Sequence, residues 1–355
     1  MFRQTMFRQT AAEVPAAASY ARKRNAYRRR AGALQGSGPA RGERAVKPPA
    51  VVRKAVFPVA GLDTALLSAT KAATKEMPTV VDKPLIHYAV EEAIAAGIRE
   101  MIFVTRRHKR AIEDHFDMAY ELEATLAGQS RDAELSAMQR LFPPDVRYLY
   151  VRQHDYSGVG SALTCARPLV GDEPFALILA DELIDGRTPA IAQLIECFNT
   201  MQQPVVGVYR AEAGDPAPDF LRTGSAYRER THHVVRFVRE GGSAAGEFIP
   251  AGRYILNASV FPHLERVRAA GAEAHGLHDA LQALLAEEPL LACEIDGERF
   301  SCATKLGLLK ATVHFGLKHP EVARAFRELI GRVGAAPQRA VAAPPRRGVR
   351  QLNGE

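Results

Sequence analysis

The segment from Lys54 to Ala65 has the residue order of a loop that binds the phosphates of a nucleotide. A short apolar run, Val56 to Val59, leads into the small residues Ala60 and Gly61, and Lys75 follows soon after. A turn of small residues exposes backbone N–H groups, and a nearby ammonium group adds positive charge. This order of residues predicts a site for a triphosphate.

Two residues of the same loop do not suit a phosphate. Asp63 brings a negative charge to a position where glycine would serve, and Ala65 carries no charge. Asp63 repels a polyanion, although aspartate tolerates the left-handed backbone that glycine permits. The loop therefore predicts a phosphate site that two of its own residues weaken.

Alternating strands and helices must position this loop. Apolar runs predict strands at Ala55–Val59, Met101–Thr105, Val146–Val151, Phe175–Leu179 and Pro204–Tyr209. Helices are predicted at Lys83–Ala96, Arg110–Phe116, Ala119–Gln129, Asp132–Leu141 and Thr188–Met201, with another opening at Ser161–Ala166. Strands separated by helices pair in parallel, which predicts an α/β fold with a mixed, mostly parallel sheet flanked by helices.

The chain after residue 210 has a weaker pattern. Residues 220–247 are polar and ambiguous. A strand at Gly252–Leu256 and helices at His278–Leu285 and Lys305–Leu317 follow.

Small or polar residues directly follow three of the predicted strands. Ala60 and Gly61 follow the first strand, Gln153 follows the third, and Asp181 follows the fourth. In an open parallel sheet, ligands bind outside the carboxyl ends of the strands. We therefore expect these residues to border one binding site.

Each candidate also has a purely structural interpretation. Asp181 is interpreted as a metal ligand, with a helix-capping carboxylate as the alternative. Lys75 is either a phosphate ligand or a solvated lysine. Gln153 either reads the edge of a base or is an ordinary turn amide. His275 and His278 have no third ligand at a useful spacing, so we expect both to be structural.

The net charge of +7 in this 355-residue chain comes from its ends. Residues 1–55 hold thirteen Lys and Arg against two Glu, and residues 336–355 hold four Arg against one Glu. Residues 56–335 are left with a net charge of −7. Because the basic residues belong to the ends, we expect no specific nucleic-acid partner.

Composition divides the chain into three parts. We expect a disordered basic arm at 1–53, one domain at 54–330, and a flexible tail at 331–355. Weak binding of the arm to an anionic surface is an alternative to a solvated arm. The repeat of Met-Phe-Arg-Gln-Thr at the start also allows a start site assigned too early.

The sequence has no apolar segment typical of a membrane span or a secretory signal. Its four cysteines are widely spaced and form no CxxC pair, which is typical of reduced thiols. We therefore expect a cytoplasmic protein.

Short motifs occur along the chain in the order found in bacterial UTP–glucose-1-phosphate uridylyltransferases. They include Val-Ala-Gly-Leu at 59–62, Val-Asp-Lys-Pro-Leu-Ile at 81–86, Leu-Ala-Asp at 179–181, Gly-Arg-Tyr-Ile-Leu at 252–256 and Lys-Leu-Gly at 305–307. The matches cover roughly residues 54–320. On these motifs, the chain resembles that family.

This resemblance implies a Rossmann-like nucleotidyltransferase fold and a Mg²⁺-dependent reaction. An oxygen of glucose 1-phosphate attacks the α-phosphorus of UTP, pyrophosphate leaves, and UDP-glucose forms. In such chemistry the protein aligns the reactants and stabilises charge, and magnesium needs only one or two carboxylates beside phosphate oxygens. The resemblance also implies a homo-oligomer.

The resemblance assigns roles to individual residues. The nucleotide-binding residues are Ala60, Gly61, Gln153 and Gly158, of which Gln153 and Gly158 read the uracil edge. The catalytic residue is Lys75, which meets phosphate. The metal ligand is Asp181, and Gly252 belongs to the strand that lines the sugar pocket.

Several positions depart from the family pattern. The family loop Gly-Leu-Gly-Thr-Arg has Asp63 and Ala65 here, so the arginine that would neutralise the leaving pyrophosphate is missing. The family segment Val-Glu-Lys-Pro aligns with Val238-Arg239-Glu240-Gly241, which reverses both charges. The second metal-binding aspartate of the family falls on Ser301, and a family histidine falls on Ser161.

Two functions from different classes remain open. The first is a uridylyltransferase of reduced efficiency that uses one aspartate-bound Mg²⁺, and the retained Gly61, Gln153 and Asp181 favour it. The second is a degenerate paralogue that binds nucleotide or nucleotide sugar without turnover, as an oligomer partner or a regulator. The departures at the loop, at Glu240 and at Ser301 favour that second function.

Overall fold

The computed structural model describes residues 50–61, 66–70, 74–107, 109–140, 143–154, 158–211, 219–239, 247–271 and 276–335. Most of the expected arm, the tail from residue 336, and the positions Asp63, Ala65, Glu240 and His275 lie outside these ranges. Residues 49–355 group into one compact unit, which holds all of the described elements.

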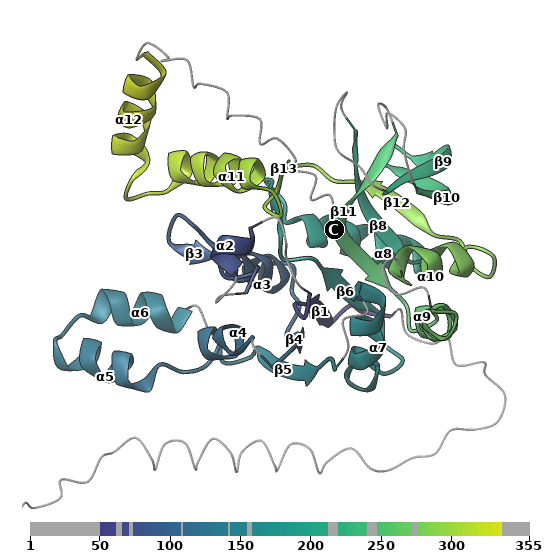
Figure 1. Cartoon of the computed structure of the whole chain (residues 1–355), viewed down its shortest axis with the longest axis horizontal. Coiled ribbons are helices and arrows are strands. Elements are labelled where there is room, and N and C mark those ends of the chain that lie inside the picture. Colours follow the sequence, from purple (N-terminus) through teal and green to yellow (C-terminus); the bar gives the residue numbers. More distant parts are fainter. Residues whose placement is uncertain are drawn as a thin grey trace, which may run out of the picture. The chain divides into compact units, whose positions relative to one another are not determined.

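A mixed sheet runs through this unit (Figure 1). Within the described residues it has nine strands, in the order β5-β4-β1-β6-β11-β8-β12-β10-β9. They are β1 Lys54–Pro58, β4 Glu100–Thr105, β5 Arg147–Arg152, β6 Phe175–Ile178, β8 Val205–Arg210, β9 Asp219–Arg228, β10 Thr231–Arg239, β11 Phe248–Leu256 and β12 Leu291–Glu294. Following the pairings across the sheet, seven of the nine strands point the same way, and β10 and β11 run in the opposite direction. The predicted α/β fold with a mixed, mostly parallel sheet is confirmed.

The five strands predicted before residue 210 are all present, each within one residue of its expected bounds. The ambiguous region after residue 210 forms the antiparallel pair β9 and β10. The strand predicted to start at Gly252 begins earlier, at Phe248. Gly252 has a φ of +69°, and the pairing of β11 with β8 shifts register between Pro250 and Tyr254. This irregularity interrupts the alternation of side chains along β11, so the sequence pattern does not reveal the residues before Gly252 as part of the strand.

Helices flank the sheet, and two small strand pairs lie beside it. The helices are α2 Leu67–Thr70, α3 Leu85–Ala95, α4 Arg110–His115, α5 Tyr120–Gly128, α6 Asp132–Arg140, α7 Gly158–Val170, α8 Ala190–Met201, α9 Val260–Ala269, α10 Gly276–Leu284, α11 Lys305–Lys318 and α12 Ala323–Ala335. The strand pairs are β2 Thr79–Val80 with β3 Lys83–Pro84, and β7 Glu182–Asp185 with β13 Glu298–Ser301. Among the described helices, none has both the length and the apolar character needed to cross a bilayer.

Several helix ends differ from the sequence prediction by one to three residues. The helix expected from Lys83 begins at Leu85, because Lys83 and Pro84 pair with β2 as an extended strand. The helix expected from Ser161 already begins at Gly158. At the other end of the chain, α12 continues past residue 330, where the tail was expected to begin.

The core lies on both faces of the sheet. Side chains alternate along β1, so Val56 packs into one apolar cluster while Ala55 and Phe57 pack into another. The first cluster includes α7, α9 and α10, and the second includes α3 and α8. These two layers hold the strand ends of β1, β5 and β6 in fixed positions at one edge of the sheet.

Candidate active site

A cavity of about 340 Å³ lies where β1, β5 and β6 end. Its lining residues are Pro58, Ala60, Gly61, Lys75, Glu76, Gln153, Gly158, Val159, Ala162, Leu179, Ala180 and Asp181. Six of the seven residues singled out from the sequence are among them, and the seventh, Gly252, is not. The structure thus brings the three strand ends to one place, as parallel strand order requires.

The most prominent polar contact in the cavity joins Lys75 and Asp181. The Nζ atom of Lys75 lies 2.7 Å from the Oδ2 atom of Asp181. Burial raises the pKa of the Asp181 carboxyl, but the charge and hydrogen bond of Lys75, with Arg253 at longer range, outweigh it and hold that pKa below its ordinary value. The cavity wall therefore carries a carboxylate and an ammonium group side by side.

A second ion pair, which the sequence pattern did not indicate, lies behind Lys75. The Nζ atom of Lys109 is 2.8 Å from the Oε2 atom of Glu76, and both side chains are buried. Burial raises the pKa of Glu76, although Lys109 and Lys75 act in the opposite direction. Both cavity carboxylates are paired with a lysine, but the pKa of Asp181 is lowered while that of Glu76 is raised, so Asp181 is the one better suited to meet a cation.

A fully buried arginine positions the turn that contains Asp181. Arg253 forms hydrogen bonds of 2.8 to 3.1 Å from its Nε and Nη2 atoms to both carboxylate oxygens of Glu92. It also donates to the carbonyl oxygens of Leu179 at 2.9 Å and Glu182 at 2.7 Å, on either side of Asp181. A planar guanidinium can hold several acceptors in fixed directions. Arg253 therefore determines where the end of β6 lies.

Gly252 lies behind the cavity wall and supports it. Its carbonyl oxygen accepts a hydrogen bond of 2.9 Å from the backbone N–H of Leu179, which lines the cavity. With a φ of +69°, it adopts a backbone conformation that favours glycine. A Cβ atom at this position would lie 3.1 Å from Cγ of Glu182 and 3.2 Å from Cβ of Leu179. The close approach of β11 to this turn thus requires a glycine.

Gln153, which directly follows β5, and Gly158, the first residue of α7, also line the cavity. Gln153 is buried, and its Nε2 atom donates over 3.4 Å to the carbonyl oxygen of Gly158. Gly158 has a φ of +73° and is the first residue of α7. The N–H groups of a helix's first turn have no partner within the helix and favour negative or polar groups. This end of the cavity can therefore accept an oxygen-rich ligand.

Ser301, where the resemblance led us to expect the family's second metal-binding aspartate, bonds to a neighbouring carboxylate. Ser301 donates from Oγ to Oε1 of Glu182 at 2.9 Å, and Nε of Arg299 lies 2.8 Å from Oε2 of Glu182. Burial and the nearby Asp181 raise the pKa of Glu182, while Arg299 and Ser301 lower it. Glu182 thus lies next to Asp181 in the chain but outside the cavity lining, held by Ser301 and Arg299.

The donor set fits a magnesium ion that shares its ligands with a nucleotide. Among the described residues, no group of three or more His, Cys, Asp and Glu side chains could enclose a metal. Magnesium is commonly held by one or two carboxylates, with waters and substrate phosphates completing its shell. Asp181 at the cavity wall provides one such carboxylate.

Comparison with known proteins agrees with the family resemblance and the fold. A family described as Nucleotidyl transferase matches residues 54–299. The UTP–glucose-1-phosphate uridylyltransferase of Staphylococcus haemolyticus is 37% identical over 286 residues, which are 80% of this chain and 99% of that protein. YngB of Bacillus subtilis, a UTP–glucose-1-phosphate uridylyltransferase, is 40% identical over 275 residues, 76% of this chain and 92% of that protein.

Solved structures give the same result. A UDP-glucose pyrophosphorylase from Acinetobacter baumannii aligns with a TM-score of 0.74 at 33% identity, over 80% of this chain and 100% of that chain. A UTP-bound structure from the same organism has a TM-score of 0.73 at 34% identity, over 79% and 99% of the two chains. The resemblance deduced from the motifs is confirmed.

Proposed function

The chain belongs to the nucleotidyl transferase family as a relative of the UTP–glucose-1-phosphate uridylyltransferases, and we propose that it transfers the uridylyl group of UTP to glucose 1-phosphate. The products are UDP-glucose and pyrophosphate. The observation that supports this best is the Lys75–Asp181 pair in a cavity bordered by Gly61 and Gln153. Such a wall offers a carboxylate for a divalent cation and an ammonium group for phosphate.

In this proposal the nucleotide lies along the two glycine-containing turns. The backbone of Ala60 and Gly61 contacts the phosphates and ribose, because neither residue has a side chain that fills the space. A Cβ atom on Gly61 would lie 3.7 Å from Cε of Lys75, an ordinary van der Waals contact, so the turn lies directly beside the Lys75 side chain. Gln153 and Gly158 offer an amide and backbone groups to the uracil edge.

Lys75 and Asp181 then act on the reacting phosphates. A phosphate oxygen of the sugar forms a bond to the α-phosphorus, and the bond from that phosphorus to pyrophosphate breaks. Lys75 stabilises the negative charge on the phosphates as it is redistributed. Magnesium, when bound, supplies further positive charge to those oxygens, with Asp181 as its protein ligand. The sugar would bind on the side of the cavity nearest β11, next to the turn that Arg253 and Gly252 hold in place.

The second candidate function is nucleotide or nucleotide-sugar binding without turnover. Ser301 favours it, because an uncharged hydroxyl bonded to Glu182 stands where the family has an aspartate. In that case the cavity would bind UDP-glucose, and the protein would act as a regulator or an oligomer partner. A homo-oligomeric state and a cytoplasmic location belong to the proposal in either form, and all four cysteines being free thiols is consistent with a reducing compartment.

Pyrophosphate release separates the two functions. We would incubate the full-length protein with UTP, glucose 1-phosphate and Mg²⁺, and measure pyrophosphate and UDP-glucose. The enzyme hypothesis expects release that falls at least about 100-fold in Asp181→Asn, because a metal ligand is removed. Asp172→Asn, at an exposed aspartate outside the cavity, is the matched control and should keep full activity. No release above background, together with UDP-glucose binding in calorimetry, would establish the second function instead.

A further inference from the structure

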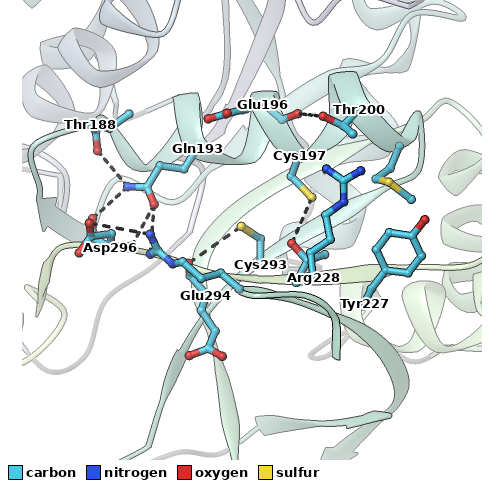
Figure 2. Close-up of a pocket in the computed structure, with 13 residues that line it drawn as sticks. Thr188, Gln193, Glu196, Cys197, Thr200, Tyr227, Arg228, Cys293, Glu294 and Asp296 are labelled. Carbon is cyan, nitrogen blue, oxygen red and sulfur yellow. Dashed lines mark hydrogen bonds and ion pairs between the residues drawn. The ribbon is translucent and has the colours of Figure 1, made fainter. Parts of the chain in front are cut away.

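A second cavity, of about 320 Å³, lies between α8, the turn that joins β9 to β10, and β12 (Figure 2). It shares no lining residue with the first cavity. Two of the four cysteines of the chain, Cys197 and Cys293, line it together. Nothing in the proposed nucleotide chemistry uses them.

The two thiols come from elements far apart in the sequence and face each other. Cys197 projects from α8 toward the sheet, and Cys293 projects from β12 toward the helix (Figure 2). The two side chains line the same cavity, so the two thiols lie on facing elements of one space. The Sγ atom of Cys197 also lies 3.8 Å from Oγ1 of Thr231, which is paired with Cys293 across β10 and β12.

The surroundings make the two thiols chemically unequal. The neighbouring Cys293 thiol, followed by Thr231 and the guanidinium of Arg228, lowers the pKa of Cys197 to about 7, against burial and Glu196, which raise it. The same contact with Cys197, together with burial, raises the pKa of Cys293. At neutral pH, Cys197 is therefore available as a thiolate, while Cys293 keeps its proton.

The other two cysteines have different environments. Burial, with the carboxylates of Glu182 and Asp181, raises the pKa of Cys302 to about 12. Cys165 packs against the apolar cluster on the α7 face of the sheet. Neither residue lines either cavity, so the second cavity holds the pair best suited to thiol chemistry.

We infer that Cys197 and Cys293 form a reversible redox site, in which Cys197 reacts with a hydroperoxide and Cys293 closes a disulfide. The proposal rests on two thiols that line one cavity and project toward each other beside Thr231, in a space that a small peroxide can enter. It does not depend on the proposed nucleotide chemistry.

The first step oxidises one sulfur by two electrons. The Cys197 thiolate attacks an oxygen of the hydroperoxide, an S–O bond forms, and the O–O bond breaks. The peroxide is thereby reduced, and its leaving oxygen takes a proton to give water or an alcohol. Cys197 is left as a sulfenic acid, which no longer carries a thiolate charge.

The second step joins the two sulfurs. Loss of the Cys197 thiolate removes the contact that contributes most to the raised pKa of Cys293. Cys293 then loses its proton and attacks the sulfenic sulfur, the S–S bond forms, and the S–O bond breaks. The departing hydroxide and that proton leave as water. A dithiol reductant reverses the change by thiol–disulfide exchange.

Peptide mapping of the oxidised protein tests this directly. The full-length protein is reduced, freed of reductant, treated with hydrogen peroxide, alkylated, and digested without reduction. We expect the loss of two of the four free thiols and a cross-linked peptide pair that contains Cys197 and Cys293, both reversed by dithiothreitol. No such pair, with Cys197 recovered as alkylated thiol, would overturn the proposal.

Variants assign the two roles. In Cys293→Ser, the cross-link should be absent and Cys197 should be trapped by dimedone as a sulfenic acid. In Cys197→Ser, both the cross-link and dimedone labelling should be lost, and the Cys165→Ser control should behave as the wild type. Dimedone labelling that persists in Cys197→Ser would show that another cysteine is the reactive thiol and would refute the assignment.

Alkylation kinetics provide a measurement that needs no variant. The rate of Cys197 alkylation by iodoacetamide, followed by mass spectrometry, should rise with pH with a midpoint near 7, set by Cys293, Thr231 and Arg228 against Glu196. A midpoint at or above about 8.5, the value of an unperturbed cysteine, would contradict the role given to Cys197.

Discussion

The Nζ atom of Lys75 lies 2.7 Å from the Oδ2 atom of Asp181, although the two residues are 106 positions apart in the chain. Their side chains are only 24% and 17% exposed. A largely buried charge is costly without a partner, so each residue stabilises the other when no ligand is bound. The pair therefore keeps a cation and an anion together at the point where a magnesium nucleotide would need both.

Replacing Lys75 by methionine should impair turnover more than folding. The substitution keeps most of the side-chain volume but removes the ammonium group, and we expect the rate constant kcat for pyrophosphate release to fall by about 10²- to 10³-fold. Lys310→Met, at an exposed lysine on α11, is the matched control and should retain the wild-type rate. Equal rates in the two variants would show that Lys75 does not act on the phosphates.

The buried Arg253–Glu92 pair should be essential for stability. Glu92→Gln leaves the guanidinium of Arg253, which is 0% exposed, without its carboxylate, and we expect a loss of about 3–5 kcal/mol in the free energy of unfolding. Urea denaturation measures the change. Glu328→Gln is the control, because its partner Arg324 is 94% exposed and such a surface pair contributes at most about 1 kcal/mol. Similar losses in both variants would refute the assigned role of the buried pair.

Gly252→Ala tests the close approach of β11 to the turn after β6. The new Cβ would meet Glu182 at 3.1 Å and would also require a left-handed backbone, so we expect a destabilisation of about 2–4 kcal/mol. Gly171→Ala has a similar φ of +67° but no atom within 4 Å of the new Cβ, and it should cost only about 1–2 kcal/mol. The difference between the two unfolding free energies isolates the steric contact, and no difference would argue against it.

His115 should make the protein less stable in mild acid. Burial, and secondarily His87 at 2.9 Å between ring nitrogens, lowers the pKa of His115 to about 4. The unfolded chain, with an ordinary histidine pKa of about 6.5, binds the proton first, so the neutral histidine favours the folded state above that pH. This stability should decline as the pH falls from about 6.5 towards 4.

A pair of histidine variants measures that decline. The free energy of unfolding, followed by urea denaturation across this pH range, should fall less steeply in His115→Gln than in the wild type. His154→Gln, at an exposed histidine, should keep the wild-type slope. An unchanged slope in His115→Gln would show that another group accounts for the acid sensitivity.

The loop departures identified in the sequence give a gain-of-function prediction. Asp63→Gly combined with Ala65→Arg removes a repelling carboxylate and adds a cation that can neutralise the leaving pyrophosphate. We expect faster pyrophosphate release in this double variant than in the wild type. Unchanged turnover would mean that these two positions do not face the phosphates.

The sequence alone determined the fold class and the edge of the sheet where the cavity lies. Apolar runs identify buried strands, helical periods separate them, and parallel strands must end at the same edge. The pattern therefore places Gly61, Gln153 and Asp181 together, and all three line the cavity. The short motifs indicated the family to which the chain belongs, and the comparisons with known proteins confirmed it.

Only the tertiary structure decided which polar groups share a buried environment. Arg253 and Glu92 are 161 positions apart, and each taken by itself resembles an ordinary surface charge in the sequence. Cys197 and Cys293 likewise meet only because α8 packs over the strand that carries Cys293. Local patterns report periodicity and turn chemistry, whereas the partner of a buried charge or thiol is set by long-range packing, which no short segment of sequence contains.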